Sequence, residues 1–128
     1  MVNEQRAVKQ FHETFGIVDN KIPALVDKDT SDLRINLIQE EFDEFKEAIA
    51  EGNLIEIADG LADILYVVYG SAVSYGIDME PVFNEVHRSN MSKVGGHKRE
   101  DGKWVKPSTY SKANLEPIIQ RQQEVEIV

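Results

Sequence analysis

The hydrophobic residues of this chain recur every three or four positions over several stretches, which is the period of an amphipathic α-helix. The stretch Asn3–Phe15 predicts a first helix, with Gly16 as its terminator. A connection that contains Pro23 follows, and Leu33–Glu51 predicts a second helix. One of the polar residues 29–32 is expected to cap that second helix, because short polar side chains accept hydrogen bonds from free helix N–H groups.

Two further helices follow. Gly52 and Asn53 interrupt the pattern, and the next stretch runs to Tyr75 and Gly76. It is apolar nearly all round, so we expect a buried, central helix. A fourth helix is expected to begin at Asp78 and to fade by residue 93.

The rest of the chain carries weaker signals. Glycine and proline make residues 94–110 a predicted loop, and residues 115–128 are expected to form a short helix or a mobile tail. No strand pattern stands out. We therefore predict one all-α domain over residues 1–128, with its core at about 30–115: a four-helix bundle with a basic C-terminal loop. Short helices with partly apolar faces are covered best by a second subunit, so a homodimer is expected.

The second helix places acids on its apolar side. At about 100° per residue, Glu41 lies in the same stripe as the hydrophobic residues, and Glu44 lies at the side of that arc. Asp43 and Lys46 point to the opposite, polar face. Arg34 also projects toward the apolar stripe; an ion pair with an acid of the same or a neighbouring chain is its expected role, with contact to a substrate as the alternative.

The third helix repeats this arrangement. Glu56, Asp59 and Asp63 fall within an arc of roughly 60° on an otherwise apolar segment and are expected to face inward. Glu56 also has a structural explanation, because Asn53 followed by Glu56 matches a helix capping box. Asp59 and Asp63 have no such explanation, since Asp is a poor residue inside a helix.

Ionised carboxylates in an apolar interface need compensation, and nearby basic residues are too few to pair with all of them. Oxygen ligands suit hard cations such as Mg²⁺ or Mn²⁺, which keep water or phosphate in their remaining positions. The pattern therefore indicates a divalent-metal site between the two helices.

Composition adds the cellular setting. The chain has 128 residues, 41% of them hydrophobic, and no cysteine, so disulfides and thiolate sites are excluded. The N-terminal residues lack the apolar region of a signal peptide, and no unbroken apolar run is long enough to span a membrane. A soluble cytoplasmic protein that does not bind membranes is expected.

The net charge of −9 is unevenly distributed. Residues 1–87 hold 6 Lys and Arg against 18 Asp and Glu, whereas residues 88–112 hold 7 against 2. The acidic body disfavours binding to nucleic acid, but a small anion could be held between a metal and the basic segment. A nucleoside triphosphate fits that description.

These motifs together resemble the all-α nucleoside triphosphate pyrophosphohydrolases, which include MazG-like proteins, dimeric dUTPases and phosphoribosyl-ATP pyrophosphohydrolases. The family signature E-E-x-x-E followed by E-x-x-D is matched by Glu40, Glu41, Glu44, Glu56 and Asp59. V-H-R-S-N-M-S-K at 86–93 and D-G-K-W-V-K-P-S-T-Y at 101–110 look like C-terminal segments of the MazG-like, dUTPase-related branch. The resemblance covers roughly residues 30–115.

The resemblance implies hydrolysis between the α- and β-phosphates of a nucleotide, which yields the monophosphate and pyrophosphate and serves house-cleaning or control of the deoxynucleotide pool. It implies Mg²⁺ ligands at Glu41, Glu44, Glu56 and Asp59, with Asp63 as a further ligand or a supporting acid. Glu40 would orient or deprotonate the attacking water.

The resemblance also implies the substrate contacts. Asn90 and Lys93 would contact the nucleotide, and Lys106 and Tyr110 would lie in a segment that covers the substrate. A homodimer, or a dimer of such dimers, is the assembly expected.

Three alternatives bear on this interpretation. Phosphoribosyl-ATP as substrate is less favoured by the C-terminal segments. A ferritin-like di-iron protein needs Glu-x-x-His, and none of His12, His87 and His97 has Glu three residues before it. A non-catalytic helical module would leave the acids merely solvated. His12 itself is expected at the surface or at the edge of the core.

Overall fold

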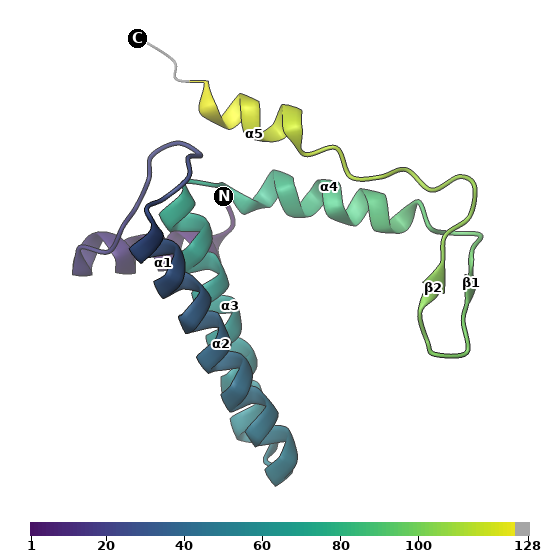
Figure 1. Ribbon diagram of the computed structural model, residues 1–128, viewed down its shortest axis with the longest axis horizontal. Coiled ribbons are helices and arrows are strands. Elements are labelled where there is room, and N and C mark those ends of the chain that lie inside the picture. Colours follow the sequence, from purple (N-terminus) through teal and green to yellow (C-terminus); the bar gives the residue numbers. More distant parts are fainter. Residues whose placement is uncertain (125–128) are drawn as a thin grey trace. The chain divides into compact units, whose positions relative to one another are not determined.

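The computed structural model describes residues 1–124 and confirms an all-α fold. The chain divides after residue 79 into two compact parts, which we describe separately. The N-terminal part contains α1 (Asn3–Phe15), α2 (Lys28–Glu51) and α3 (Leu54–Tyr75) (Figure 1). The C-terminal part contains nearly all of α4 (Met79–Met91), then β1 (His97–Lys98), β2 (Trp104–Val105) and α5 (Glu116–Gln123). The prediction of a single domain over residues 1–128 stays a prediction.

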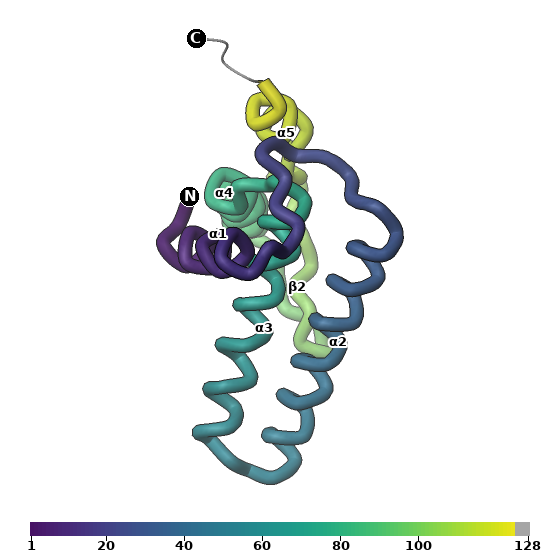
Figure 2. The backbone as a smooth tube through the Cα atoms, turned by 90° about the vertical axis from the view of Figure 1, so that its left-hand side faces the viewer, coloured from purple at the N-terminus to yellow at the C-terminus, as the bar shows by residue number. Residues whose placement is uncertain are grey.

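Helices α2 and α3 form an antiparallel hairpin and lie side by side in Figure 2, whereas α2 lies in front of α3 in Figure 1. Helix α2 begins five residues earlier than predicted, and its cap is Asp27 instead of one of residues 29–32, because the Asp27 side chain accepts a hydrogen bond from Thr30 N at 2.9 Å. Gly52, with φ +65°, ends α2 in the left-handed conformation that glycine adopts without strain. Asn53 then caps α3 through a hydrogen bond from Glu56 N at 3.1 Å, as predicted.

Helix α1 and the segment after it close one end of α3. Gly76, with φ +73°, ends α3, and a Cβ there would collide with Ile22 O. Ala24 N donates to Tyr75 O at 3.0 Å, which pairs this connection with the end of the helix. In Figure 2, α1 lies beside the C-terminal half of α3. The connection and α1 therefore cover only one end of the hairpin.

Polar side chains fill much of the interior at this end of α3. His12 is buried, contrary to its expected position, and its Nδ1–H donates to Val18 O at 3.0 Å. Arg34 is also buried and donates to Ser71 Oγ at 3.1 Å and Val67 O at 3.0 Å. The predicted ion pair of Arg34 is not among the salt bridges of the described residues. Neutral oxygens of α3 take the place of the expected carboxylate.

Gly70 makes room for that guanidinium. A Cβ at residue 70 would collide with Arg34 Nη2 and lie 3.1 Å from His12 Nε2. Gly70→Ala should therefore lower the free energy of unfolding by about 1–3 kcal/mol, despite the better helix propensity of Ala. Urea denaturation measures the loss. In an Arg34→Ala background, Gly70→Ala should lower the free energy of unfolding only slightly. An equal loss in that background would contradict the steric explanation.

Helix α3 is central in the N-terminal part, since α1 and α2 both pack against it, but the expectation that it is buried is wrong. Burial is concentrated at Gly60 and from Gly70 to Ser74, whereas five large side chains of the helix are at least 42% exposed: Leu54, Ile55, Leu61, Leu65 and Tyr66. Only α1 and α2 pack against α3 among the described residues with extended contacts, so one side stays uncovered. By length and composition α3 could also cross a membrane, but core helices of soluble proteins meet the same criterion.

The C-terminal part pairs α4 with a returning segment. Two-residue strands β1 and β2 form an antiparallel hairpin with His97 opposite Val105, where a loop was predicted. The alternation of polar and apolar residues is too short there to indicate a strand. Helix α5 confirms the short helix, while residues 125–128 of the predicted tail lie outside the described residues.

Glu85 fastens the returning segment to α4. It accepts hydrogen bonds from Arg88 Nε at 2.6 Å and from Asn114 N at 2.7 Å, and Arg88 Nη2 donates to Lys112 O at 3.2 Å. The Arg88 side chain, and then the Asn114 N–H, lower the pKa of Glu85 to about 2. The carboxylate therefore stays ionised far below neutral pH.

We expect the attachment to persist above pH 4.5 and to weaken only as the pH falls toward 2. The attachment weakens as the pH falls, and not as it rises, because the folded-state pKa of Glu85 lies below its ordinary value of 4.5. Glu85→Gln should speed hydrogen exchange at the Asn114 amide at neutral pH, with the exposed Glu100→Gln as a control. Unchanged exchange at Asn114 in Glu85→Gln would contradict this role.

Candidate metal centre

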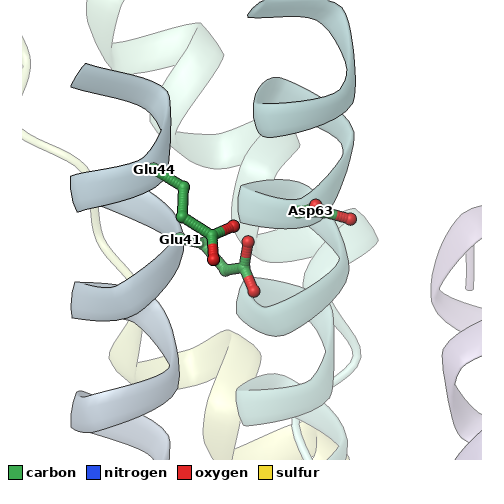
Figure 3. A group of neighbouring side chains, drawn as sticks. All are labelled: Glu41, Glu44 and Asp63. Atoms are coloured by element: carbon green, nitrogen blue, oxygen red, sulfur yellow. The ribbon is translucent and has the colours of Figure 1, made fainter. Parts of the chain in front are cut away.

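Three carboxylates converge between α2 and α3. Glu41 and Glu44 project from successive turns of α2, and Asp63 projects from the facing side of α3 (Figure 3). One oxygen from each lies within 4.8 Å of the other two. A spacing of three residues puts the two glutamates on the same side of a helix, so the local sequence creates this convergence.

A small residue brings the two helices together beside this cluster. At Gly60, one turn before Asp63, an added Cβ would lie 3.3 Å from the Cα of Phe45. The α3 backbone thus approaches α2 next to Glu44. The close approach keeps acids from two separate helices within reach of one ion.

Glu41 is the acid of the cluster that most needs a partner. Its side chain is half-buried, and its Oε2 is buried with no hydrogen-bond partner among the described residues. Loss of hydration raises the pKa of Glu41, and the negative charges of Glu44 and Asp63 raise it further. Nothing within the described part of the chain neutralises this carboxylate, which would therefore gain from a cation.

The cluster fits a hard divalent cation. Its donors are three carboxylates from two rigid helices, and one oxygen of Glu41 is buried and unpaired among the described residues. Such oxygen donors suit Mg²⁺ or Mn²⁺ and leave further coordination positions for water and phosphate. No histidine belongs to this described cluster, which disfavours the di-iron alternative.

The other predicted acids lie outside this group. Glu56 and Asp59 are exposed, so the expectation that these two acids face inward is wrong, whereas Glu44 is exposed and yet projects toward α3 as a member of the cluster. The reason is that, among the helices of the N-terminal part, only α2 packs along the N-terminal half of α3, because α1 lies beside its C-terminal half (Figure 2). Glu56 and Glu44 nevertheless line the same open hollow near the Gly52 turn.

Glu40 occupies a distinct position. Its side chain is exposed, and its charge contributes to the raised pKa of Glu41 after the charges of Glu44 and Asp63. It therefore lies at the edge of the cluster. That is the place expected for a group that acts on water next to the metal ligands.

The predicted substrate residues are gathered within the C-terminal part. Asn90 and Lys93 line one pocket there. The ammonium groups of Lys93 and Lys106 lie 6.0 and 4.6 Å from the centre of the Tyr110 ring. Trp104 also lines the pocket of Asn90 and Lys93, although the sequence motif gave no reason to single it out. Its aromatic character inside a basic segment was the available signal.

A comparison with known protein families identifies the family of the chain. The model of the phosphoribosyl-ATP pyrophosphohydrolase family matches residues 8–90, which is more than half of the chain and includes all three converging acids. The chain belongs to this family. Membership confirms the resemblance to the all-α, MazG-like pyrophosphohydrolases and supports a pyrophosphohydrolase-type activity.

Part of this chain is similar in sequence to a viral protein. The uncharacterized protein L479 of Acanthamoeba polyphaga mimivirus is 42% identical over 79 residues, which cover 59% of this chain. The match covers 32% of L479, so the chain spans about a third of the length of that relative. The similarity indicates a shared module and leaves the substrate open.

Proposed function

We propose that this protein hydrolyses a nucleotide between its α- and β-phosphates and releases a nucleoside monophosphate and pyrophosphate. The observation that carries the proposal is the unpaired, buried Oε2 of Glu41 among the carboxylates of Glu44 and Asp63, in a member of a pyrophosphohydrolase family. House-cleaning of unwanted nucleotides, or control of the deoxynucleotide pool, is the corresponding role.

Mg²⁺ is the proposed cofactor, and Mn²⁺ suits the same donors. Glu41, Glu44 and Asp63 would hold the ion. Glu56 and Asp59 would bind the same ion, or a second one, from the solvent-exposed side of the cluster. The ion would supply positive charge that neutralises the phosphate oxygens. The converging helices supply the rigidity, since the carboxylates are attached to regular backbone on both sides.

Glu40 is proposed to position the attacking water and to take its proton. The water oxygen forms a bond to phosphorus while the bridging P–O bond breaks, and the bridging oxygen leaves with the departing phosphate group. A carboxylate at the edge of the metal ligands suits this role because general bases must reach the nucleophile rather than the metal. Asn90, Lys93, Lys106 and Tyr110 are proposed to contact the nucleotide.

The class of substrate has two candidates. The segments at 86–93 and 101–110 favour a nucleoside triphosphate such as dUTP, dCTP or a damaged nucleotide. The family match at residues 8–90 favours phosphoribosyl-ATP equally well. A non-catalytic helical module predicts no hydrolysis, so activity itself separates that alternative.

A homodimer is proposed as the working assembly, and a dimer of dimers is compatible with it. The exposed apolar side chains of α3, among them Ile55 at 80% and Leu65 at 57%, support this proposal because a second subunit would remove them from water. A cytoplasmic location is proposed from the absence of cysteine and from the class of substrate.

A substrate panel tests the proposed function. Purified protein is incubated with canonical and damaged triphosphates and with phosphoribosyl-ATP, and pyrophosphate is measured with Mg²⁺, with Mn²⁺ and with EDTA. We expect Mg²⁺-dependent release from one class of substrate. Absence of release from every compound would favour the non-catalytic alternative.

A further inference from the structure

A pocket within the C-terminal part combines an aromatic ring with polar and charged groups. Asn90 and Lys93 come from the end of α4 and the turn that follows, Val94 comes next, and Trp104 comes from β2. Trp104 is 44% exposed and Val94 is 68% exposed. The surface of this pocket is almost entirely apolar, which suits the face of a planar ring, and Asn90 and Lys93 are the lining residues that carry an amide and an ammonium group.

The indole of Trp104 is held in place although much of it is exposed. Its Nε1–H donates to Lys93 O at 2.7 Å, and the Trp104 backbone lies opposite that of Lys98 in the β1–β2 hairpin. Gly96 permits this position, because a Cβ there would collide with Val105 O and lie 2.6 Å from Trp104 Nε1. A ring fixed in this way loses little conformational freedom when it binds a ligand.

Positive charge lies next to the ring. The ammonium groups of Lys93 and Lys106 share the Tyr110 ring, and Ser89 Oγ donates to the Tyr110 hydroxyl at 3.5 Å. Trp104 and this pair of lysines are thus linked through Lys93. Base stacking on an aromatic side chain beside cations is a general way to bind nucleotides.

We propose that Trp104 stacks on the base of the nucleotide, with the Asn90 amide at the base edge and Lys93 at a phosphate. The proposal deepens the proposed function and rests on it, because that function makes a nucleotide the ligand. It assigns Trp104 as a binding residue for the base. Stacking tolerates different bases, so any discrimination would come from Asn90.

The chain contains one tryptophan, which makes its fluorescence a direct probe of this pocket. The probes are α,β-methylene analogues of dUTP, dCTP and ATP, added in EDTA so that neither hydrolysis nor metal contributes. Tripolyphosphate is the control that carries the charge without a base. We expect at least one analogue to quench the fluorescence, whereas tripolyphosphate should leave it unchanged.

Variants separate stacking from folding. Trp104→Leu should weaken binding of the quenching analogue about tenfold by calorimetry, and Trp104→Phe should restore most of the affinity. Both variants lack the Nε1–H donor, and only Trp104→Phe keeps an aromatic ring. The difference in affinity between them therefore measures stacking. Equal losses in the two variants would overturn the proposal.

Other outcomes are equally decisive. If no analogue quenches Trp104, or if a single-stranded deoxythymidine oligonucleotide quenches it at lower concentration than every analogue, the proposal is overturned. Pyrophosphate release by the wild-type protein is measured in parallel. Pyrophosphate release without fluorescence quenching would contradict the role of Trp104 alone. Quenching without pyrophosphate release would contradict the proposed hydrolysis and would still support the binding site.

Discussion

Glu41→Gln is expected to lower Mg²⁺-dependent pyrophosphate release by about 10²- to 10³-fold. The reason is that Glu41 supplies the buried, unpaired oxygen of the cluster, and a neutral amide is a far weaker ligand for a hard cation. Initial rates at saturating Mg²⁺ measure the effect. Asp43→Asn is the matched control on α2, because Asp43 is exposed and accepts a hydrogen bond from Gln39. Asp43→Asn should keep wild-type activity.

The same substitution should stabilise the metal-free protein. Because burial and the charges of Glu44 and Asp63 raise the folded-state pKa of Glu41, the contribution of this group to the stability of the metal-free protein should be largest at low pH and should be lost as the pH rises through that pKa. Glu41→Gln should therefore raise the unfolding midpoint in EDTA at neutral pH. Mg²⁺ should raise the midpoint of the wild type and leave that of the variant nearly unchanged. An equal Mg²⁺ response in both proteins would contradict Glu41 as a ligand.

Removal of both ammonium groups beside Tyr110 should weaken nucleotide binding about a hundredfold. Lys93→Ala with Lys106→Ala deletes two cations that would each form a charge-assisted hydrogen bond to phosphate. The backbone carbonyl of residue 93 remains, so its hydrogen bond to Trp104 is preserved. Calorimetry with an α,β-methylene triphosphate gives the affinity.

A control with the same change in net charge makes this test specific. Lys98→Ala with Lys103→Ala removes two exposed lysines of the β1–β2 hairpin. We expect this variant to lose less than threefold, and both double variants to keep the Mg²⁺-dependent rise in unfolding midpoint. A similar loss in both pairs would show that overall charge, and no particular lysine, attracts the nucleotide.

The helices were predictable from sequence because their ends carry local signals. Gly16, Gly52 and Gly76 take the positive φ that ends each of the first three helices, and Asn53 caps α3. The convergence of Glu41 with Glu44 also follows from helical spacing alone. For Asp63, spacing indicated its side of α3, and the close approach at Gly60 then brought it within range.

The remaining features depend on tertiary contacts that periodicity does not encode. An apolar face indicates that something should cover α3, but not whether a helix of the same chain does so, and here Ile55 and Leu65 stay exposed. Glu56 and Asp59 were expected inside for the same reason. Arg34 was expected to pair with an acid, yet the space at Gly70 lets it reach carbonyl and hydroxyl oxygens of α3.

The C-terminal part shows a similar limit. The motif residues Asn90, Lys93, Lys106 and Tyr110 were proposed from resemblance, and the hairpin brings Trp104 beside two of them. The contact depends on Gly96, whose small size permits the close approach of the indole. No spacing rule relates residues 93 and 104 in a segment without helical or strand period.

Pyrophosphate release by the wild type and by Glu41→Gln, each with Mg²⁺ and with EDTA, tests the central claim most directly. The substrate is the most active compound of the panel, and phosphorus NMR identifies the products. We predict monophosphate and pyrophosphate from the wild type with Mg²⁺, and almost none in the other three reactions. Release in EDTA, or full activity of Glu41→Gln with Mg²⁺, would contradict a metal centre at these carboxylates.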